Sequence, residues 1–156
     1  MKQGFTLIEL MIVVALIGSL FVATAVNYGK YNRKKIVEKE AQELITDLRH
    51  AQSKALAGEK PSGCGANYLE GFKLKFTTSA DYRIVGLCAG AEINVKTNLD
   101  LGDSVVKQSG PDEITFKLLG HGVTSAGTIR LSGYTGQWFY NLSVSATGEI
   151  TDEGFE

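Results

Sequence analysis

The stretch that decides the fold is Gly4-Phe5-Thr6-Leu7-Ile8-Glu9-Leu10, together with the apolar run that continues to Val26. The 22 residues from Phe5 to Val26 contain one charged side chain, Glu9, and no proline. A helix of about 20 apolar residues crosses a hydrocarbon layer of about 30 Å. We therefore predict that residues 5–26 form a transmembrane helix, in which the carboxylate of Glu9 needs a partner.

The residues around Glu9 resemble the prepilin signature of type IV pilins and type II secretion pseudopilins. Residues 1–4 match the short leader peptide of that signature. The resemblance implies that prepilin peptidase cleaves between Gly4 and Phe5 and that Phe5 is N-methylated. It also implies that Glu9 acts in assembly, by pairing with the N-terminal amine of a neighbouring subunit. One helical turn separates Phe5 from Glu9, which suits such a pairing.

Two other interpretations of the N-terminus remain open. A secretory signal peptide would be cut after Ala23-Thr24-Ala25 and would leave Val26 as the first residue. Against it, the apolar run is longer than the usual length of about 7–15 residues and contains Glu9. A plain single-pass anchor would give Glu9 no role. Sequencing of the mature N-terminus distinguishes Phe5 from Val26.

The remainder of the chain is large enough for one soluble domain. About 100 residues follow the N-terminal helix, enough for a single modest core. Residues 58–156 hold twelve acidic and eight basic side chains, a balance near −4, so no strong attraction to nucleic acid is expected. The 18 glycines and two prolines are typical of a turn-rich β domain.

The two cysteines, Cys64 and Cys88, have no C-x-x-C spacing and no neighbouring histidine, so no metal site is predicted. In a domain that lies outside the cytoplasm, such a pair is expected to form a disulfide. Two free, buried thiols are the alternative.

The basic residues beside the apolar run and the prepilin resemblance predict opposite orientations of the chain in the membrane. Lys30, Arg33, Lys34 and Lys35 follow the run, whereas only Lys2 precedes it. The positive-inside tendency would place the C-terminal side in the cytoplasm. The resemblance and the cysteine pair favour export, and we follow them. We expect a single-pass protein of the inner (cytoplasmic) membrane, with its head in the periplasm or outside, that later enters a pilus or pseudopilus filament.

Residues 27–57 have the pattern of an amphipathic helix that packs on its own domain. An apolar stripe recurs at spacings of three and four, formed by Val37, Ala41, Leu44, Leu48, Ala51 and Ala55 and widened by Ile45 and Leu56. Charged residues, Asp47 among them, are expected on the solvated face. Gly58 is expected to end the helix.

Residues 58–156 are predicted to form a β-rich globular head. A loop at 59–67 precedes alternating segments that indicate strands, at 72–76, 82–88, 92–96, 104–108, 114–118, 128–132, 138–145 and 149–151. The predicted fold class is α+β, with a long N-terminal α-helix packed on an antiparallel β-rich head, the lollipop architecture of pilins.

The C-terminal half resembles the GspH/FimT-type domain of minor pseudopilins. The resemblance lies in Ile114-Thr115-Phe116, Gly120, Gly127–Leu131, Leu142–Ser145 and Gly148-Glu149-Ile150. That family often has a basic residue where this chain has Glu149, and an acidic tail follows, with Asp152, Glu153 and Glu156. The charges needed to bind DNA phosphates are therefore missing, and nucleic acid is not an expected partner.

No pattern of catalytic residues supports an enzyme, and no cofactor is predicted. His50 lies on the amphipathic helix and His121 lies in a Gly-His-Gly loop that lacks the lysine of a phosphate-binding loop. Trp138-Phe139-Tyr140 favours core packing over a platform for a sugar or base.

Together these features predict a minor pilin or pseudopilin that initiates, caps or decorates a type IV pilus or a type II secretion pseudopilus. The expected partners are other pilins or pseudopilins, the prepilin peptidase/methylase, the inner-membrane assembly platform and, before assembly, membrane lipid. The alternative is a binding module displayed on a pilus, either an adhesin or a DNA-uptake receptor.

Overall fold

The computed structural model describes residues 6–134 and 136–156, and for residues 22–27 it describes the backbone alone. The chain divides into two units, Met1–Lys35 and Ile36–Glu156. We call residues 6–35 the stem and residues 36–156 the head. One helix, α1 (Leu7–Ala57), contributes to both units.

Helix α1 continues without a break through Gly18 and Gly29. It ends where the sequence predicts, because Gly58 adopts a left-handed φ of 62° that favours glycine. The amide of Gly58 donates to the carbonyl of Ala55 at 3.3 Å, and the amide of Glu59 donates to the carbonyl of Lys54 at 3.2 Å. These bonds satisfy carbonyl groups that the end of a helix leaves without partners.

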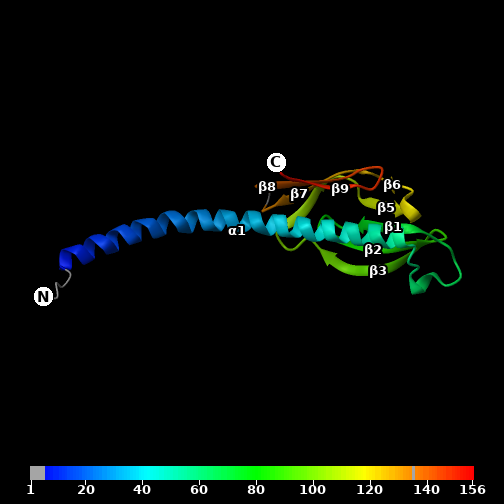
Figure 1. Ribbon diagram of the computed structural model, residues 1–156, viewed down its shortest axis with the longest axis horizontal. Helices are drawn as coiled ribbons and strands as arrows, with labels where there is room; N and C mark the ends of the chain where they lie inside the picture. Colours follow the sequence, from blue (N-terminus) through cyan, green and yellow to red (C-terminus); the bar gives the residue numbers. More distant parts are fainter. Residues whose placement is uncertain (1–5, 135) are drawn as a thin grey trace. The chain divides into compact units, whose positions relative to one another are not determined.

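The head contains two antiparallel sheets (Figure 1). The five-stranded sheet has the order β3-β2-β1-β5-β6 and the four-stranded sheet has the order β4-β7-β8-β9. The strands are β1 (Leu69–Phe76), β2 (Asp81–Cys88), β3 (Ala91–Asp100), β4 (Val105–Ser109), β5 (Glu113–Lys117), β6 (Val123–Thr124), β7 (Gly127–Gly133), β8 (Trp138–Val144) and β9 (Ile150–Phe155). Two short 3-10 helices, η1 (Ser62–Cys64) and η2 (Leu118–Gly120), lie in the connections.

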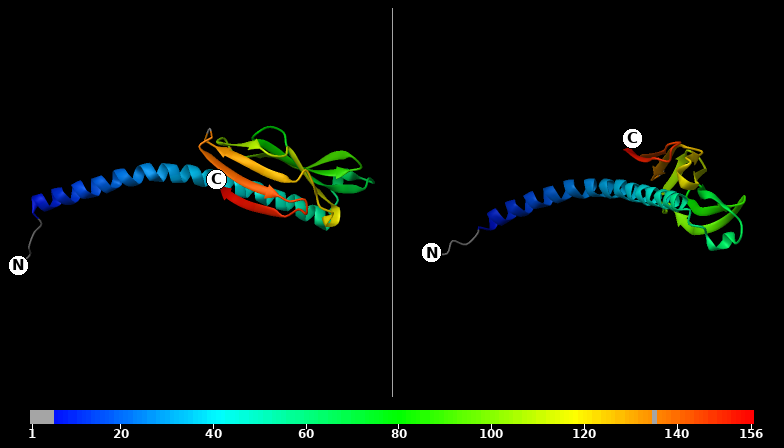
Figure 2. Two further views of the ribbon diagram at one scale, coloured as in Figure 1. Left: turned by 90° about the horizontal axis from the view of Figure 1, so that it is seen from above. Right: turned by 45° about the vertical axis from the view of Figure 1, so that its right-hand side comes forward.

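Both sheets share one core with the C-terminal half of α1, which runs along them (Figure 2). The predicted apolar stripe supplies the helix side of this core: Val37, Ala41, Leu44, Ile45, Leu48, Ala51 and Ala55 are each at most 1% exposed. The stripe prediction is wrong for Leu56, which is 51% exposed in the last turn of α1. The approach of β7 to α1 is close, because a side chain at Gly133 would overlap Val37.

Each predicted strand is present, with ends that shift by a few residues. The prediction missed β6, a two-residue strand whose pairing with β5 comes from the tertiary fold rather than from alternation. It also ended β9 too early. The segment Asp152-Glu153-Gly154 has poor strand propensity, and it is extended because β9 pairs with β8 as far as Phe155.

Cys64 and Cys88 form a disulfide, with their Cα atoms 5.6 Å apart. Both residues are buried. The bond connects the loop that leaves α1 with the end of β2, as predicted from the cysteine pair.

Candidate functional site

The predicted cleavage and methylation site, Gly4 and Phe5, lies outside the residues that the structure describes. The first described residue, Thr6, caps α1. The Thr6 hydroxyl accepts a hydrogen bond from the amide of Glu9 at 3.3 Å, and its carbonyl accepts one from the amide of Leu10 at 3.2 Å. This is the N-cap geometry that threonine favours. Glu9 is therefore the third residue of the helix.

This position gives Glu9 a local role beside the one that the prepilin resemblance implies. Threonine at the N-cap and glutamate three residues later is the spacing of a capping box. A carboxylate in the first turn is also favoured by the helix dipole. Thr6 is a functional residue that the hydrophobic pattern does not predict, although the Thr-x-x-Glu spacing is a local signal for it. The exposed Glu9 lies in the first turn of α1.

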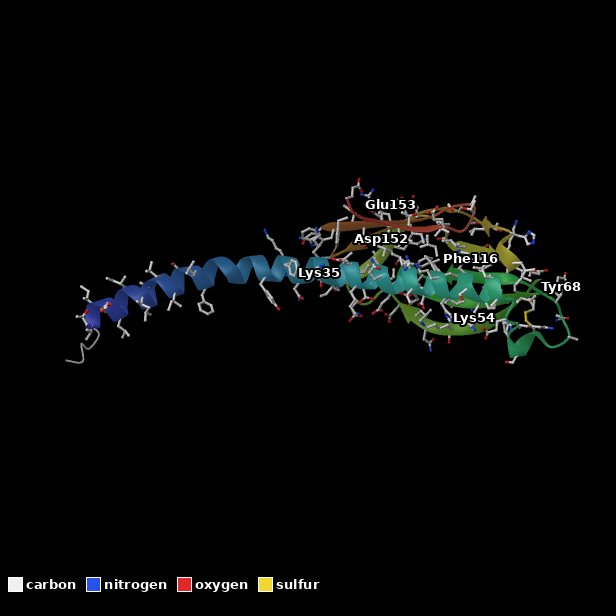
Figure 3. All side chains as sticks on the ribbon, viewed as in Figure 1. Lys35, Lys54, Tyr68, Phe116, Asp152 and Glu153 are labelled. Carbon is white, nitrogen blue, oxygen red and sulfur yellow. A yellow bond between two sulfur atoms is a disulfide. The ribbon has the colours of Figure 1, made fainter. Side chains whose placement is uncertain are left out.

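The stem exposes large apolar side chains on all sides of the helix (Figure 3). Their exposed fractions range from 46% for Val13 to 76% for Leu7. The set comprises Leu7, Ile8, Leu10, Met11, Ile12, Val13, Val14, Leu16, Ile17, Leu20 and Phe21. A contiguous apolar surface of this kind marks a segment that contacts another apolar partner.

The predicted transmembrane segment at residues 5–26 is described only in part. Residue 5 and the side chains of residues 22–27 are outside the described set. Across the residues that are described, no helix combines the length and apolarity that crossing a membrane requires.

Exposed tyrosines and basic residues occupy the last turns of the stem. Tyr28 and Tyr31 are 73% and 60% exposed. The amine of Lys35 lies 5.8 Å from the centre of the Tyr31 ring, within range of a cation–π contact. Lys30 and Arg33 are also exposed in this segment.

In the head, Asp47 ties α1 to the five-stranded sheet. The prediction that Asp47 lies on the solvated face is wrong, because the residue is only 6% exposed. Its carboxylate accepts hydrogen bonds from the hydroxyl of Tyr82 at 3.0 Å and from the amine of Lys96 at 2.7 Å. Burial, followed by the nearby charge of Asp47, raises the pKa of Tyr82. The prediction failed because β3 and β2 cover this side of the helix and supply partners for the carboxylate.

A second polar tie joins α1 to β8 and β9. The side-chain amide of Gln42 donates to the hydroxyl of Tyr140 at 3.2 Å and to the carboxylate of Asp152 at 2.6 Å. Burial, together with a hydrogen bond to Asp152, raises the pKa of Tyr140 to about 12. The predicted core role of the aromatic cluster is confirmed for Tyr140 and for Trp138, which packs against the core. Phe139 instead lies under the guanidinium of Arg130, 4.3 Å from its ring centre.

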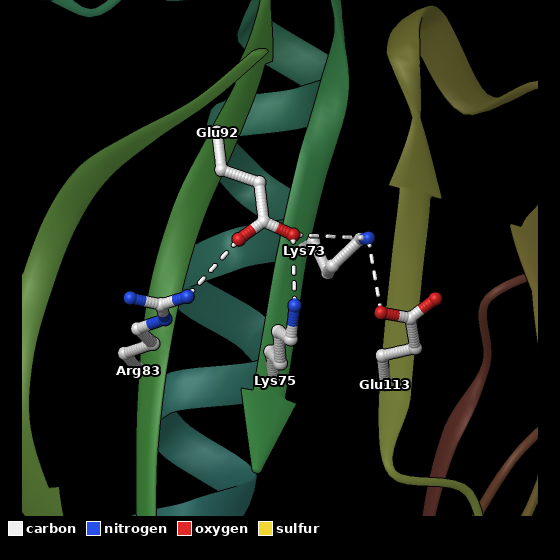
Figure 4. Close-up of polar contacts among 5 residues, drawn as sticks. All are labelled: Lys73, Lys75, Arg83, Glu92 and Glu113. Carbon is white, nitrogen blue, oxygen red and sulfur yellow. Dashed lines mark hydrogen bonds and ion pairs between the residues drawn. The ribbon is translucent and has the colours of Figure 1, made fainter. Parts of the chain in front are cut away.

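An ionic cluster lies across β1, β2, β3 and β5, with α1 visible behind the strands (Figure 4). Glu92 pairs with Lys73 at 3.4 Å, with Lys75 at 3.2 Å and with Arg83 at 3.1 Å, and Lys73 also pairs with Glu113 at 3.0 Å. Burial lowers the pKa of Lys73, but its carboxylate partners outweigh burial and raise it. Burial raises the pKa of Glu92, but the two lysines outweigh burial and lower it. All five charges thus have partners within the head.

The residues considered for catalysis or metal binding are not gathered into a site. His50 and His121 are both exposed. Within residues 6–134 and 136–156, no three His, Cys, Asp or Glu side chains are placed so that they could hold a metal ion. Among the described residues, the candidates for a functional role are therefore Glu9, at the start of the stem, and the exposed surfaces of the stem and of the head.

Two family models match this chain, one over most of the head and one at the N-terminus. The family model of the type II transport protein GspH matches residues 40–148, and the prokaryotic N-terminal methylation motif matches residues 1–25. The minor pseudopilin EpsH from the type 2 secretion system of Vibrio cholerae has a similar structure, with a TM-score of 0.55 and 12% sequence identity. That match covers 76% of this chain and 96% of EpsH, and it supports the long helix on an antiparallel β head. No curated protein matches the chain. Since the GspH model spans well over half of the residues, the chain belongs to the family of the type II transport protein GspH.

Proposed function

We propose that this protein is a minor pseudopilin, a structural and non-enzymatic subunit of a type II secretion pseudopilus. The observation that carries the proposal is the combination of a GspH-type head with a stem whose apolar side chains are exposed on all sides. A head of this kind completes its own core. The stem requires an apolar environment, which membrane lipid supplies before assembly and other stems supply afterwards.

Processing at Gly4 and Phe5 creates the group that Glu9 needs. The match to the N-terminal methylation motif supports cleavage between these two residues and methylation of Phe5. Cleavage leaves an ammonium group at Phe5. Two opposite charges attract each other much more strongly in an apolar filament core than in water. Glu9 of one protomer therefore pairs with the Phe5 amine of its neighbour and sets the axial register.

The placement of Glu9 in the first turn of α1 supports this assembly role. A carboxylate at the bilayer centre would cost about 2.5–3.5 kcal/mol on insertion scales, and the cost falls toward the interface. The Thr6 cap makes Glu9 a terminal residue of the helix, so its carboxylate lies near one interface when the stem is inserted. In this setting the protein is an inner-membrane precursor with an exported head, and it enters the pseudopilus where it initiates, caps or decorates the filament.

The experiment that tests the proposal replaces Glu9 in the full chain. We expect Glu9→Gln and Glu9→Ala to insert and to be cleaved normally, yet to enter filaments poorly. Glu9→Asp keeps the negative charge, so this variant should still enter filaments in part. The measurements are sequencing of the mature N-terminus and quantification of the protein in sheared filaments. A mature chain that begins at Val26, or normal incorporation of Glu9→Gln, would contradict the proposal.

A matched pair at residue 4 tests the processing step by itself. The peptidase must accommodate a very small residue before the cleaved bond, so Gly4→Ala should be processed far better than Gly4→Val. The conversion of precursor to mature protein on a gel gives the result. Equal processing of the two variants would mean that the cleavage site lies elsewhere.

A further inference from the structure

Residues 28–35, which we call the collar, combine exposed tyrosines with four basic side chains. The basic residues are Lys30, Arg33, Lys34 and Lys35. In the sequence, the collar comes just after the apolar run that ends at Val26. The sequence therefore changes from apolar to charged at the collar.

The collar residues lie on more than one side of the helix. At about 100° per residue, Tyr28, Tyr31 and Lys35 fall on one side and Lys30, Arg33 and Lys34 on the other. A surface made for one protein partner gathers its residues on one side of a helix. A helix that passes through a membrane surface meets headgroups on all sides, which suits the distribution seen here.

We propose that the collar is a binding site for anionic phospholipid headgroups in the membrane that holds the unassembled protein. This inference rests on the membrane-inserted precursor of the proposed function. Lysine and arginine donate charge-assisted hydrogen bonds to phosphate oxygens. Tyrosine is favoured at the boundary between hydrocarbon and water. Each basic residue near an anionic surface contributes about a fivefold preference.

The site also sets the depth of the stem. Residues 9 and 30 are separated by about 31 Å along an α-helix, close to the hydrocarbon thickness of about 30 Å. A collar held at one membrane surface therefore places Glu9 at the opposite surface. There the carboxylate remains hydrated, and the adjoining Gly4–Phe5 bond is accessible from the cytoplasmic side.

The test compares lipid selectivity in two charge-matched variants of the full chain. The collar variant carries Lys30→Gln, Arg33→Gln and Lys34→Gln. The control variant carries Arg49→Gln, Lys60→Gln and Lys117→Gln, three exposed basic residues of the head. Each protein is reconstituted in phosphatidylcholine vesicles that contain some phosphatidylglycerol. Electron paramagnetic resonance of spin-labelled lipids then measures which lipid is enriched beside the protein.

We expect the wild type and the control variant to prefer phosphatidylglycerol over phosphatidylcholine by about fivefold or more. The collar variant should lose most of this preference, and added salt should weaken it in the wild type. Equal selectivity in all three proteins, or equal loss in both variants, would overturn the proposal. Flotation of the vesicles reports insertion separately. Failure to insert would refute the membrane step of the proposed function, whereas insertion without selectivity would refute the collar site alone.

Discussion

The stem and the head contain the same apolar residue types, but these side chains are exposed in the stem and buried in the head. Leu16 and Leu48 belong to one helix, yet Leu16 is 60% exposed and Leu48 is completely buried. In the head, two sheets cover the apolar stripe of α1. In the stem, the apolar side chains face outward on all sides. The head therefore completes its core within one chain, whereas the stem has the surface of a segment that another molecule must cover.

The carboxylates of the two regions show the same contrast. Asp47 is buried in the head and is satisfied by Tyr82 and Lys96 of the same chain. Glu9 is exposed in the stem, and its proposed partner is the amine of another protomer. A buried charge needs its partner within the fold. An exposed carboxylate in an otherwise apolar segment can instead pair with a charged group of another protomer.

The largest expected effect comes from truncating matched phenylalanines in the two regions. Phe72→Ala removes a completely buried ring from the head, so the free energy of unfolding of the head should fall by about 3–5 kcal/mol. Phe21→Ala removes a ring that is 71% exposed in the stem, and it should leave that free energy nearly unchanged. Denaturant unfolding of the detergent-solubilised chain, followed by Trp138 fluorescence, provides both values. Similar losses in the two variants would show that the stem contributes to the fold of the head.

The disulfide belongs to the head alone and should have the next largest effect. Replacing both cysteines, Cys64→Ser and Cys88→Ser, opens a loop with a sequence separation of 24. In the chain-entropy model the cost is about 3.5 kcal/mol. The same unfolding assay measures it, and a reducing agent should destabilise the wild type but not the double variant. A head that is equally stable with and without the disulfide would contradict this estimate.

Much of the fold could be predicted because its signals are local. The repeat from Val37 to Ala55 predicts the buried side of α1, and alternation at Phe72, Leu74 and Phe76 predicts β1. The predictions that failed depend on contacts between distant segments. Asp47 lies at the edge of the apolar stripe, but its burial depends on Tyr82 and Lys96, which reach it from β2 and β3. Leu56 lies at the edge of the stripe in the last turn of α1, where it is 51% exposed.

The candidate site is predicted from the short prepilin signature rather than from hydrophobic periodicity. The Gly-Phe pair and Glu9 are recognised through their resemblance to the prepilin signature, and the methylation-motif match supports that resemblance. The cap at Thr6 is a local signal that the hydrophobic pattern hides, because Thr6 lies in a sequence that is otherwise apolar. The proposed assembly partner of Glu9, the amine of another protomer, is implied by the resemblance alone, because no contact within one chain reports it.

The hydrogen bonds that join Tyr140 and Asp152 to α1 predict that the stability of the head depends on pH. The ordinary pKa of tyrosine is about 10, and burial with a hydrogen bond to Asp152 raises that of Tyr140 to about 12. The unfolded chain therefore loses this proton first. The stabilisation is complete below about pH 10 and is lost as the pH rises toward 12. Tyr140→Phe should make the decline shallower across this range, and an unchanged slope would exclude Tyr140 as a contributor.

The smallest expected effect lies at the start of the stem. Thr6→Ala removes the hydroxyl that accepts from the amide of Glu9, so the first turn of α1 should lose about 1 kcal/mol of stability. Thr46 is the matched control, because its hydroxyl donates to the carbonyl of Gln42 within the same helix and caps nothing. Thr46→Ala should be nearly neutral. Amide hydrogen exchange should accelerate at Glu9 and Leu10 in Thr6→Ala alone, while the head remains protected. Unchanged exchange there would mean that neighbouring residues hold Glu9 in place without the cap, and faster exchange in the head would mean that stem and head do not fold independently.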